Sequence, residues 1–312
     1  MEHELTGRSE PERRSKALSG GFGTAPLTQP VPRPAEDPCH PIEGGARPWH
    51  PSLPIRISYL VHLGALAATL VEPSTLPRAI GAIAANHFLL GLAGLAPKGA
   101  WLGPNLSRLP ISARKKGMVA ITFDDGPDPD VTPRVLDLLD RYGVAASFFC
   151  IGAQAVRFPD IGREIVRRGH AVENHSYHHY HRFALLGPAS LRRELAEAQA
   201  VLTGLTGRRP RFFRAVAGLR NPFLEPALCR SGLRLVSWTR RGFDTLDRSP
   251  RRVAARLTKY LRAGDILVAH DGGSARTPSG VPVVLEALPR VLDAVAERGL
   301  RAARLDSLIR DD

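Results

Sequence analysis

Short apolar runs and amphipathic stretches alternate along the chain from Met118 onward. The apolar runs have the length of buried strands and lie at 118–123, 145–151, 171–174, 211–214, 234–238, 265–269 and 300–303. Amphipathic stretches typical of helices that cover a sheet lie near 131–142, 159–168, 189–204, 223–231, 249–262 and 282–298. Strands that alternate with crossover helices favour a parallel sheet. The pattern therefore predicts an α/β barrel or a doubly wound sheet.

Two longer apolar stretches precede this region. Residues 57–71 and 79–97 contain no Asp, Glu, Lys or Arg, and a turn over 72–78 joins them. Each stretch is slightly shorter than the roughly 20 residues of a membrane-spanning helix. Asn86 and His87 in the second stretch fit the alternative, a soluble helical hairpin packed on the main domain. We favour membrane association.

Basic residues flank this pair of stretches on both sides, so a membrane hairpin would keep both of its ends in the cytoplasm. They are Arg13, Arg14, Arg47 and Arg56 before the pair, and Arg108, Arg114, Lys115 and Lys116 after it. The expected localisation is therefore membrane-associated with the α/β domain in the cytoplasm, and a soluble cytoplasmic protein is the alternative. No apolar stretch follows Met1, so no cleavable signal peptide is expected.

The first part of the chain has a different composition. Residues 1–55 are rich in Pro, Gly and charged residues and show no apolar periodicity, so a disordered arm is expected there. The predicted organisation is this arm, an apolar helical hairpin over 56–110, and an α/β domain over 111–312.

The chain has 312 residues and a formal net charge of +13, which favours anionic partners. The sequence has no zinc-finger spacing, no RNP-like aromatic strand and no lysine-rich tail, so no nucleic-acid partner is expected. Arginines are dense from Arg208 to Arg262 and suit either a solvated surface or phosphate groups of a substrate. The three cysteines, Cys39, Cys150 and Cys229, are too far apart for a disulfide framework or a thiolate metal site.

Two adjacent carboxylates, Asp124 and Asp125, stand where the first apolar run ends in a Gly-Pro turn. Like charges repel, so a fold seldom holds two together without a cation or a shared proton. A metal ligand beside a general base would use both groups. From this run alone, a solvated turn that caps a helix explains them equally well.

Four histidines lie within residues 175–181. His175 and His179 are four residues apart, so one helical turn or a tight loop can direct both at one cation. Two imidazoles and one carboxylate form a set that suits Zn²⁺ or a similar divalent ion. His178 and His181 are expected to be bystanders.

Other polar side chains also follow predicted strands, namely Arg214, Asp244 and His270. In barrels of parallel strands, the C-terminal ends of the strands meet on one face, where chemistry gathers. An arginine there can keep a carboxylate ionised, although a surface ion pair is its alternative role. A histidine there can donate a proton to a leaving group. Trp238 can wall a sugar pocket, but a core position is the stronger expectation.

The run 122–127, the run 175–179, Arg214 and the run 267–270, in this order, resemble the motifs of the polysaccharide deacetylase (NodB-homology) family over about 118–305. The resemblance implies a distorted (β/α)₇ barrel, an incomplete TIM-like fold, and metal-dependent hydrolysis of an N-acyl amide on a carbohydrate. It implies a divalent ion, with Zn²⁺ expected and Co²⁺ or another ion as the alternative. By position, it implies a general base at Asp124, metal ligands at Asp125, His175 and His179, a general acid at His270, and residues that tune the base and the acid at Arg214 and Asp244.

The arginine motif departs from the family pattern. The family continues it with proline and an aromatic residue, whereas this chain has Val216 and Ala217. The Ala217 N–H can still stabilise an oxyanion, but the missing ring removes a surface that would contact the sugar. These altered residues motivate one alternative, a noncatalytic glycan-binding protein on the same barrel. The apolar hairpin and the arginine density motivate another, a deformylase or deacetylase of a lipid-diphosphate-linked sugar.

Overall fold

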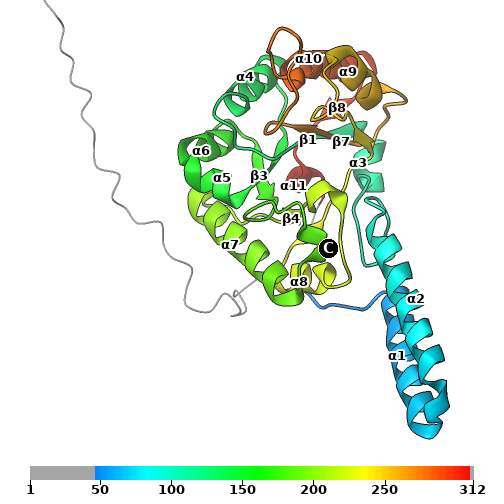
Figure 1. Ribbon diagram of the computed structural model, residues 1–312. Helices are drawn as coiled ribbons and strands as arrows, with labels where there is room; N and C mark the ends of the chain where they lie inside the picture. Colours follow the sequence, from blue (N-terminus) through cyan, green and yellow to red (C-terminus); the bar gives the residue numbers. More distant parts are fainter. Residues whose placement is uncertain (1–45, 310–312) are drawn as a thin grey trace, which may run out of the picture. The chain divides into compact units, whose positions relative to one another are not determined.

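A computed structural model describes residues 46–309 (Figure 1). The predicted disordered arm lies outside the described residues as far as residue 45. Residues 46–55, the last part of that predicted arm, are described. Arg47 pairs with Glu225 at 2.7 Å, and the first helix already begins at Leu53.

The strands form one curled parallel sheet, which confirms the predicted barrel. The order along the sheet is β5-β4-β3-β2-β1-β7-β6, and β8 pairs with the start of β1. β5 and β6 stand at opposite ends of this order, yet only residues 236–239 separate them in the chain, so the sheet has to curl. The strands are β1 Met118–Asp124, β2 Ser147–Cys150, β3 Ala171–Asn174, β4 Phe212–Phe213, β5 Arg234–Leu235, β6 Arg240–Arg241, β7 Ile266–His270 and β8 Arg301–Ala302.

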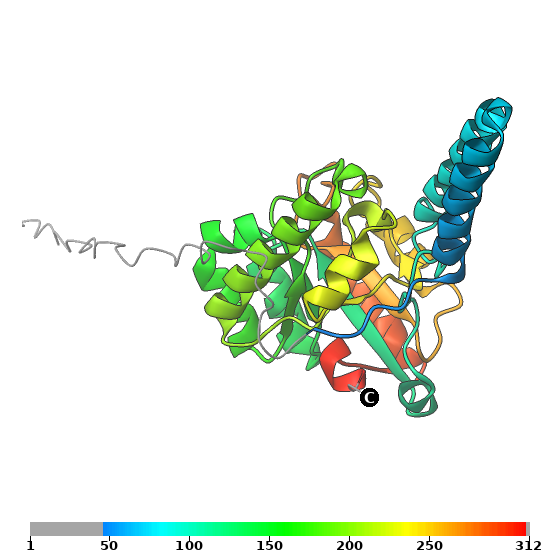
Figure 2. The same ribbon diagram turned by 90° about the horizontal axis from the view of Figure 1, so that it is seen from below.

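Helices surround this sheet (Figure 2). Several begin with proline in their first turn, where the backbone N–H has no partner within the helix and its absence loses no hydrogen bond. α4 is followed by Gly143, whose left-handed φ of 63° ends the helix. The longer helices are α4 Thr132–Tyr142, α6 Pro159–Arg167, α7 Pro188–Thr206, α8 Leu224–Arg230, α9 Pro250–Thr258 and α10 Val283–Glu297. The shorter ones are α3 Ile111–Lys115, α5 Gly152–Arg157, α11 Leu305–Leu308, and the 3₁₀ turns η2 Phe183–Leu185 and η3 Val216–Gly218.

Alternate residues of β1 serve two different layers. Ile121 and Phe123 pack in the apolar layer that includes the inner faces of α4 and α10. Ala120 faces the barrel interior with Phe149, Phe212 and Ile266. Because side chains alternate along a strand, Thr122 and Asp124 also point inward, and both contact Arg214 there. The strand therefore delivers Asp124 to the interior of the barrel mouth.

Residues 97–109 close the gap between the two ends of the sheet. The Leu106 N–H donates to the Leu235 carbonyl at 3.0 Å, and the Ser237 N–H donates to the Leu106 carbonyl at 3.0 Å. The Leu109 N–H donates to the Gly264 carbonyl at 2.9 Å, and the Leu109 side chain packs in the barrel interior. This segment thus packs as part of the barrel, although the sequence pattern grouped it with the hairpin.

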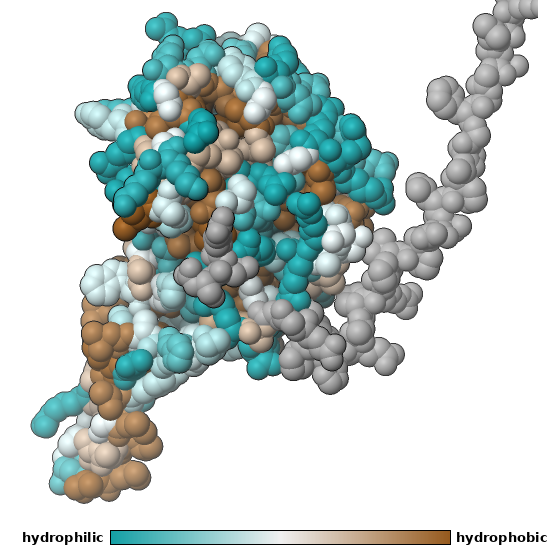
Figure 3. Space-filling view, turned by 180° about the vertical axis from the view of Figure 1, so that it is seen from behind, coloured by the Kyte–Doolittle hydropathy of each residue, from teal (hydrophilic) through white to brown (hydrophobic). Residues whose placement is uncertain are grey.

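The hairpin consists of α1 Leu53–Val71 and α2 Leu76–Gly94, which lie side by side and are joined by the 3₁₀ turn η1 Pro73–Thr75. Both helices are long and apolar enough to cross a membrane by length and composition. Leu60, Leu70 and Phe88 are 68%, 75% and 66% exposed, and apolar residues colour the hairpin surface brown in Figure 3. The hairpin thus presents an apolar outer surface.

Polar groups lie instead between the two helices of the hairpin. The Asn86 amide donates to Ser58 Oγ at 2.8 Å, and the Nε2 atoms of His62 and His87 are 3.1 Å apart. This distribution is the reverse of an amphipathic pair in water, where apolar side chains face inward. Asn86 and His87 suggested a soluble hairpin from the sequence. In the structure, their side chains lie within hydrogen-bond distance of polar side chains of α1.

Candidate active site

The predicted site residues meet at the C-terminal ends of the strands. Asp124 and His270 are direct neighbours in the register between β1 and β7. Asp125 follows β1, His175 follows β3 and Arg214 follows β4. The barrel therefore brings together residues that are up to 146 positions apart in the sequence, since 270 − 124 = 146.

Three side chains form a group that could hold a metal ion. Asp125 Oδ1 lies 3.1 Å from His175 Nε2 and 3.0 Å from His179 Nε2. This buried carboxylate oxygen has no hydrogen-bond partner among the described residues. Three potential ligand atoms that converge without a donor between them fit a divalent cation. The donor set, two imidazoles and one carboxylate, suits Zn²⁺ or Co²⁺.

The backbone carbonyl of Arg214 orients the first histidine. It lies 2.8 Å from His175 Nδ1, so this nitrogen carries the proton and donates it. In the neutral ring, Nε2 then has a free lone pair directed at Asp125. A hydrogen bond on the far nitrogen is the usual means of fixing the tautomer of a metal ligand.

Glu194 on α7 holds the loop over residues 175–179, a role that no sequence pattern indicated. Its carboxylate accepts the Tyr177 and His178 N–H groups at 3.1 and 2.9 Å, and it lies 2.6 Å from His178 Nδ1. His178 therefore faces Glu194 rather than the metal-ligand group, in line with its expected role as a bystander. Ser176 and His179 have φ of 64° and 56°, a strained conformation that these contacts support.

Arg214 forms a buried ion pair with Asp124. Arg214 Nη1 lies 2.6 Å from Asp124 Oδ1 and 2.8 Å from Thr122 Oγ1. The guanidinium also stacks 4.0 Å from the ring centre of Phe149, and its side chain is 1% exposed. Burial lowers the pKa of Arg214, while Asp124 opposes that shift. Removing either partner would leave a buried charge without compensation.

His270 pairs with Asp244, as the sequence motifs implied. Asp244 Oδ1 lies 2.8 Å from His270 Nδ1, and Asp244 Oδ2 accepts the His270 backbone N–H at 2.7 Å. Burial favours the neutral ring, but the hydrogen bond and charge of Asp244 outweigh it and raise the pKa of His270 to about 9. The ring is therefore a protonated donor at neutral pH.

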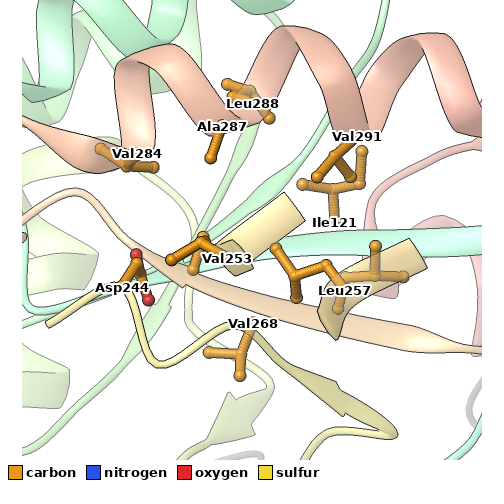
Figure 4. Close-up of a pocket in the computed structure, with 11 residues that line it drawn as sticks. Ile121, Asp244, Val253, Leu257, Val268, Val284, Ala287, Leu288 and Val291 are labelled. Carbon is orange, nitrogen blue, oxygen red and sulfur yellow. The ribbon is translucent and has the colours of Figure 1, made fainter. Parts of the chain in front are cut away.

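An apolar cavity lies directly beside Asp244. Of its eleven lining residues, ten are apolar, and they come from α9, α10, β1 and β7 (Figure 4). The Asp244 side chain is fully buried, so little water screens its charge. This environment strengthens the attraction between Asp244 and the His270 imidazolium.

Ala217 lies in the turn η3, next to Gly218. Its φ is 53°, and its N–H has no acceptor among the described residues. Trp238 is 6% exposed, in line with the expected core position, and its ring packs against Gly218. The altered motif therefore still presents a free backbone donor.

Asp271, which the sequence reasoning missed, supports the loop after β1. Thr132 Oγ1 donates to Asp271 Oδ2 at 2.6 Å, and the Asp271 N–H donates to the Asp124 carbonyl at 3.2 Å. Burial raises the pKa of Asp271 to about 7. A Cβ at Gly126 would lie 2.1 Å from Asp271 Oδ2, so only glycine fits there.

Asp244→Asn should lower the pKa of His270 from about 9 toward its ordinary value of 6.5, because the substitution removes the charge that holds the proton. NMR titration of the metal-free protein with ¹³C-labelled histidine would measure this shift. His170 is an internal control: burial lowers its pKa to about 4, and the substitution should leave it unchanged. An unchanged His270 titration would show that Asp244 does not hold the proton.

Comparisons with known proteins show the family of this chain. The polysaccharide deacetylase family model matches residues 112–236. A peptidoglycan-N-acetylglucosamine deacetylase of Bacillus cereus is 29% identical over 195 residues, which cover 62% of this chain and 88% of that protein. A chitooligosaccharide deacetylase of Azorhizobium caulinodans is 34% identical over 163 residues, covering 51% and 76%. The structure of a family 4 acetyl xylan esterase from Clostridium thermocellum, in complex with a cobalt ion, is 32% identical with a TM-score of 0.55, covering 61% and 89%. The chain belongs to the polysaccharide deacetylase family of hydrolytic enzymes.

Proposed function

We propose that this protein is a metal-dependent hydrolase that removes the N-acetyl group from an N-acetylated carbohydrate. One observation carries the proposal: Asp125, His175 and His179 converge at the same strand ends as a buried carboxylate paired with Arg214 and a buried histidine paired with Asp244. The named activities of the deacetylases from Bacillus cereus and Azorhizobium caulinodans support the same reaction.

Asp125, His175 and His179 would hold the divalent ion, and we propose Zn²⁺, with Co²⁺ as the alternative. When bound, such an ion supplies Lewis-acid activation of water and of a carbonyl group. The unpartnered Asp125 Oδ1 supports this assignment, since a buried carboxylate oxygen without a donor is costly unless a cation meets it.

Groups of the protein carry out the remaining steps of the reaction. Asp124 takes a proton from the attacking water, while Arg214 holds its Oδ1. The water oxygen bonds to the amide carbon, and the Ala217 N–H donates to the carbonyl oxygen as that oxygen gains charge. His270 then gives its proton to the amine nitrogen as the C–N bond breaks. The products are acetate and a free amino sugar.

Mutations should distinguish the proposed general base from the proposed metal ligand. Asp124→Asn should lower kcat by about 10²- to 10⁴-fold, the usual contribution of a general base, and leave Zn²⁺ bound. Asp125→Asn should weaken Zn²⁺ binding itself. Acetate release with an N-acetylglucosamine oligomer would report turnover, and calorimetry would report the Zn²⁺ affinity.

The exposed Asp130 provides the matched control, since Asp130→Asn should change neither quantity. Activity that survives removal of all metal by a chelator would refute the metal-dependent mechanism. Absence of Zn²⁺ or Co²⁺ at Asp125, His175 and His179 in soaked crystals would favour the alternative, a noncatalytic glycan-binding protein.

We also propose that α1 and α2 insert into a membrane, with the barrel on the cytoplasmic side. Support comes from the exposed apolar side chains of both helices and from the polar contacts between them. Nineteen residues per helix span about 28 Å at 1.5 Å per residue, close to the thickness of a bilayer core. The basic flank formed by Arg108, Arg114, Lys115 and Lys116 favours the cytoplasmic side.

Charges on the outer surface of the hairpin should release the protein from membranes. Leu63→Glu together with Leu66→Glu should move the chain from the alkaline-washed membrane pellet to the soluble fraction, because acidic side chains near a helix centre each oppose insertion by about 3 kcal/mol. Leu185→Glu on the barrel is the matched control, since Leu185 is 85% exposed but lies outside the hairpin. A wild-type chain that is washed off at alkaline pH would contradict the insertion. Digestion of the barrel by protease added to intact cells would contradict the cytoplasmic side.

A second candidate substrate is a lipid-diphosphate-linked N-acyl sugar, from which the enzyme would remove an acetyl or formyl group. The observation that favours it is the position of the hairpin end: Gly94, the last residue of α2, contacts Arg220, three residues after Ala217. A membrane-embedded hairpin would thus hold the catalytic mouth near the lipid headgroups. The dense arginines between 208 and 262 can pair with phosphates.

The two substrate classes can be compared directly with the full chain in lipid vesicles. The lipid-linked hypothesis predicts kcat/KM at least about tenfold higher for an N-acetyl sugar diphosphate lipid than for a soluble chitooligosaccharide, a difference of about 1.4 kcal/mol. Release of acetate and of formate would be measured separately. Equal values for both substrates would leave the soluble glycan as the substrate class.

A further inference from the structure

The end of the hairpin is packed against the segment that carries the candidate oxyanion donor. The Arg220 N–H donates to the Gly94 carbonyl at 3.2 Å. A Cβ at Gly94 would lie 2.1 Å from the Arg220 carbonyl oxygen. The backbones of α2 and of Arg220 are therefore in direct contact, with no side chain between them.

The Arg220 side chain fastens the residues that follow α2. Its guanidinium donates to the Gly99 carbonyl and, at 3.4 Å, to the Gly103 carbonyl. Arg220 is 5% exposed, and burial lowers its pKa. Glu225 is the nearby acid that opposes this shift, but the Glu225 carboxylate is engaged with Arg47 at 2.7 Å. The carbonyl groups of Gly99 and Gly103 thus accept the hydrogen bonds of this buried guanidinium, whose Nε has no partner among the described residues.

A second contact acts directly on the turn η3. A Cβ at Gly218 would lie 2.7 Å from the Pro97 Cβ and 2.7 Å from Trp238 Cη2. Ser237 Oγ and the Asn105 amide lie 2.6 and 2.9 Å from the Pro97 carbonyl and fix Pro97 in place. Gly218 is therefore held between the segment after the hairpin and the core tryptophan.

The backbone of η3 requires such support. Ala217 and Gly218 both have left-handed φ, of 53° and 76°, and a non-glycine residue in that region is strained. Strain of this kind persists only when the surroundings over-determine the conformation. Here the surroundings are Pro97, Trp238 and the Arg220 contacts, and two of these three depend on residues that follow α2.

We propose that Arg220 is a positioning residue, which couples the hairpin to catalysis by fastening residues 217–220 to residues 94–103 and so holding the Ala217 N–H toward the substrate. This inference rests on the proposed deacetylase function. It extends that function, because the position of the hairpin in the membrane would then affect the rate of turnover as well as the location of the protein.

The contact can be disturbed from both sides, with a matched control for each. Arg220→Ala removes the carbonyl contacts, and Arg209→Ala removes an arginine that donates to the Ser231 carbonyl away from this segment. Gly94→Ala forces α2 away from Arg220, whereas a Cβ at Gly91, three residues earlier in the same helix, meets nothing within 4 Å. Acetate release, Zn²⁺ affinity and Tm would be measured with the full chain in vesicles.

Arg220→Ala and Gly94→Ala should each lower kcat at least about tenfold, with KM nearly unchanged, since loss of one oxyanion donor costs about 10²- to 10³-fold. Zn²⁺ affinity should stay at the wild-type value, and Arg220→Lys should restore part of kcat. Arg209→Ala and Gly91→Ala should match the wild type. Unchanged kcat in both test variants, or equal losses in the controls, would overturn the coupling. Failure of the proposed function would show instead as a wild-type protein without turnover.

Discussion

The ion pair between Arg214 and Asp124 is the interaction on which the rest of the site depends. Arg214 is nearly fully buried and contacts side chains or carbonyl groups on β1 and β2 and in the segment after β5. A buried guanidinium is tolerated only when its hydrogen bonds are satisfied. Because its backbone carbonyl also orients His175, one residue connects Asp124 to the group that could hold a metal ion. The geometry of both halves of the site therefore follows from where the barrel places β4.

The hairpin follows a different constraint. Its polar side chains are paired between the two helices, and its large apolar side chains face outward. The barrel requires the opposite arrangement. The two parts nevertheless share residues 94–109, which continue from α2 and then complete the sheet. The chain therefore runs from the hairpin directly into the wall of the barrel.

The sequence predicted the barrel and the main chemical residues because both leave local signals. Apolar runs marked seven strands, and the Asp-Asp, His-x₃-His and strand-end histidine patterns marked the groups that meet at the barrel mouth. β6 was missed because its residues are Arg240 and Arg241, whose side chains give no apolar signal. Glu194, Asp271 and Arg220 were also missed. Their roles arise from contacts with backbone groups far away in the chain, and no spacing rule encodes such contacts.

The closure of the sheet by residues 97–109 also determines how this protein can be divided. Two domains joined by a flexible linker can be separated by a cut between them. Here a cut after residue 110 would strip Leu106 from Val236 and remove Leu109, 3% exposed, from the barrel interior. The fragment would carry an unpaired strand edge over an opened core, a combination that promotes aggregation. A cut between the hairpin and the barrel would therefore open the barrel wall, because residues 97–109 are part of that wall.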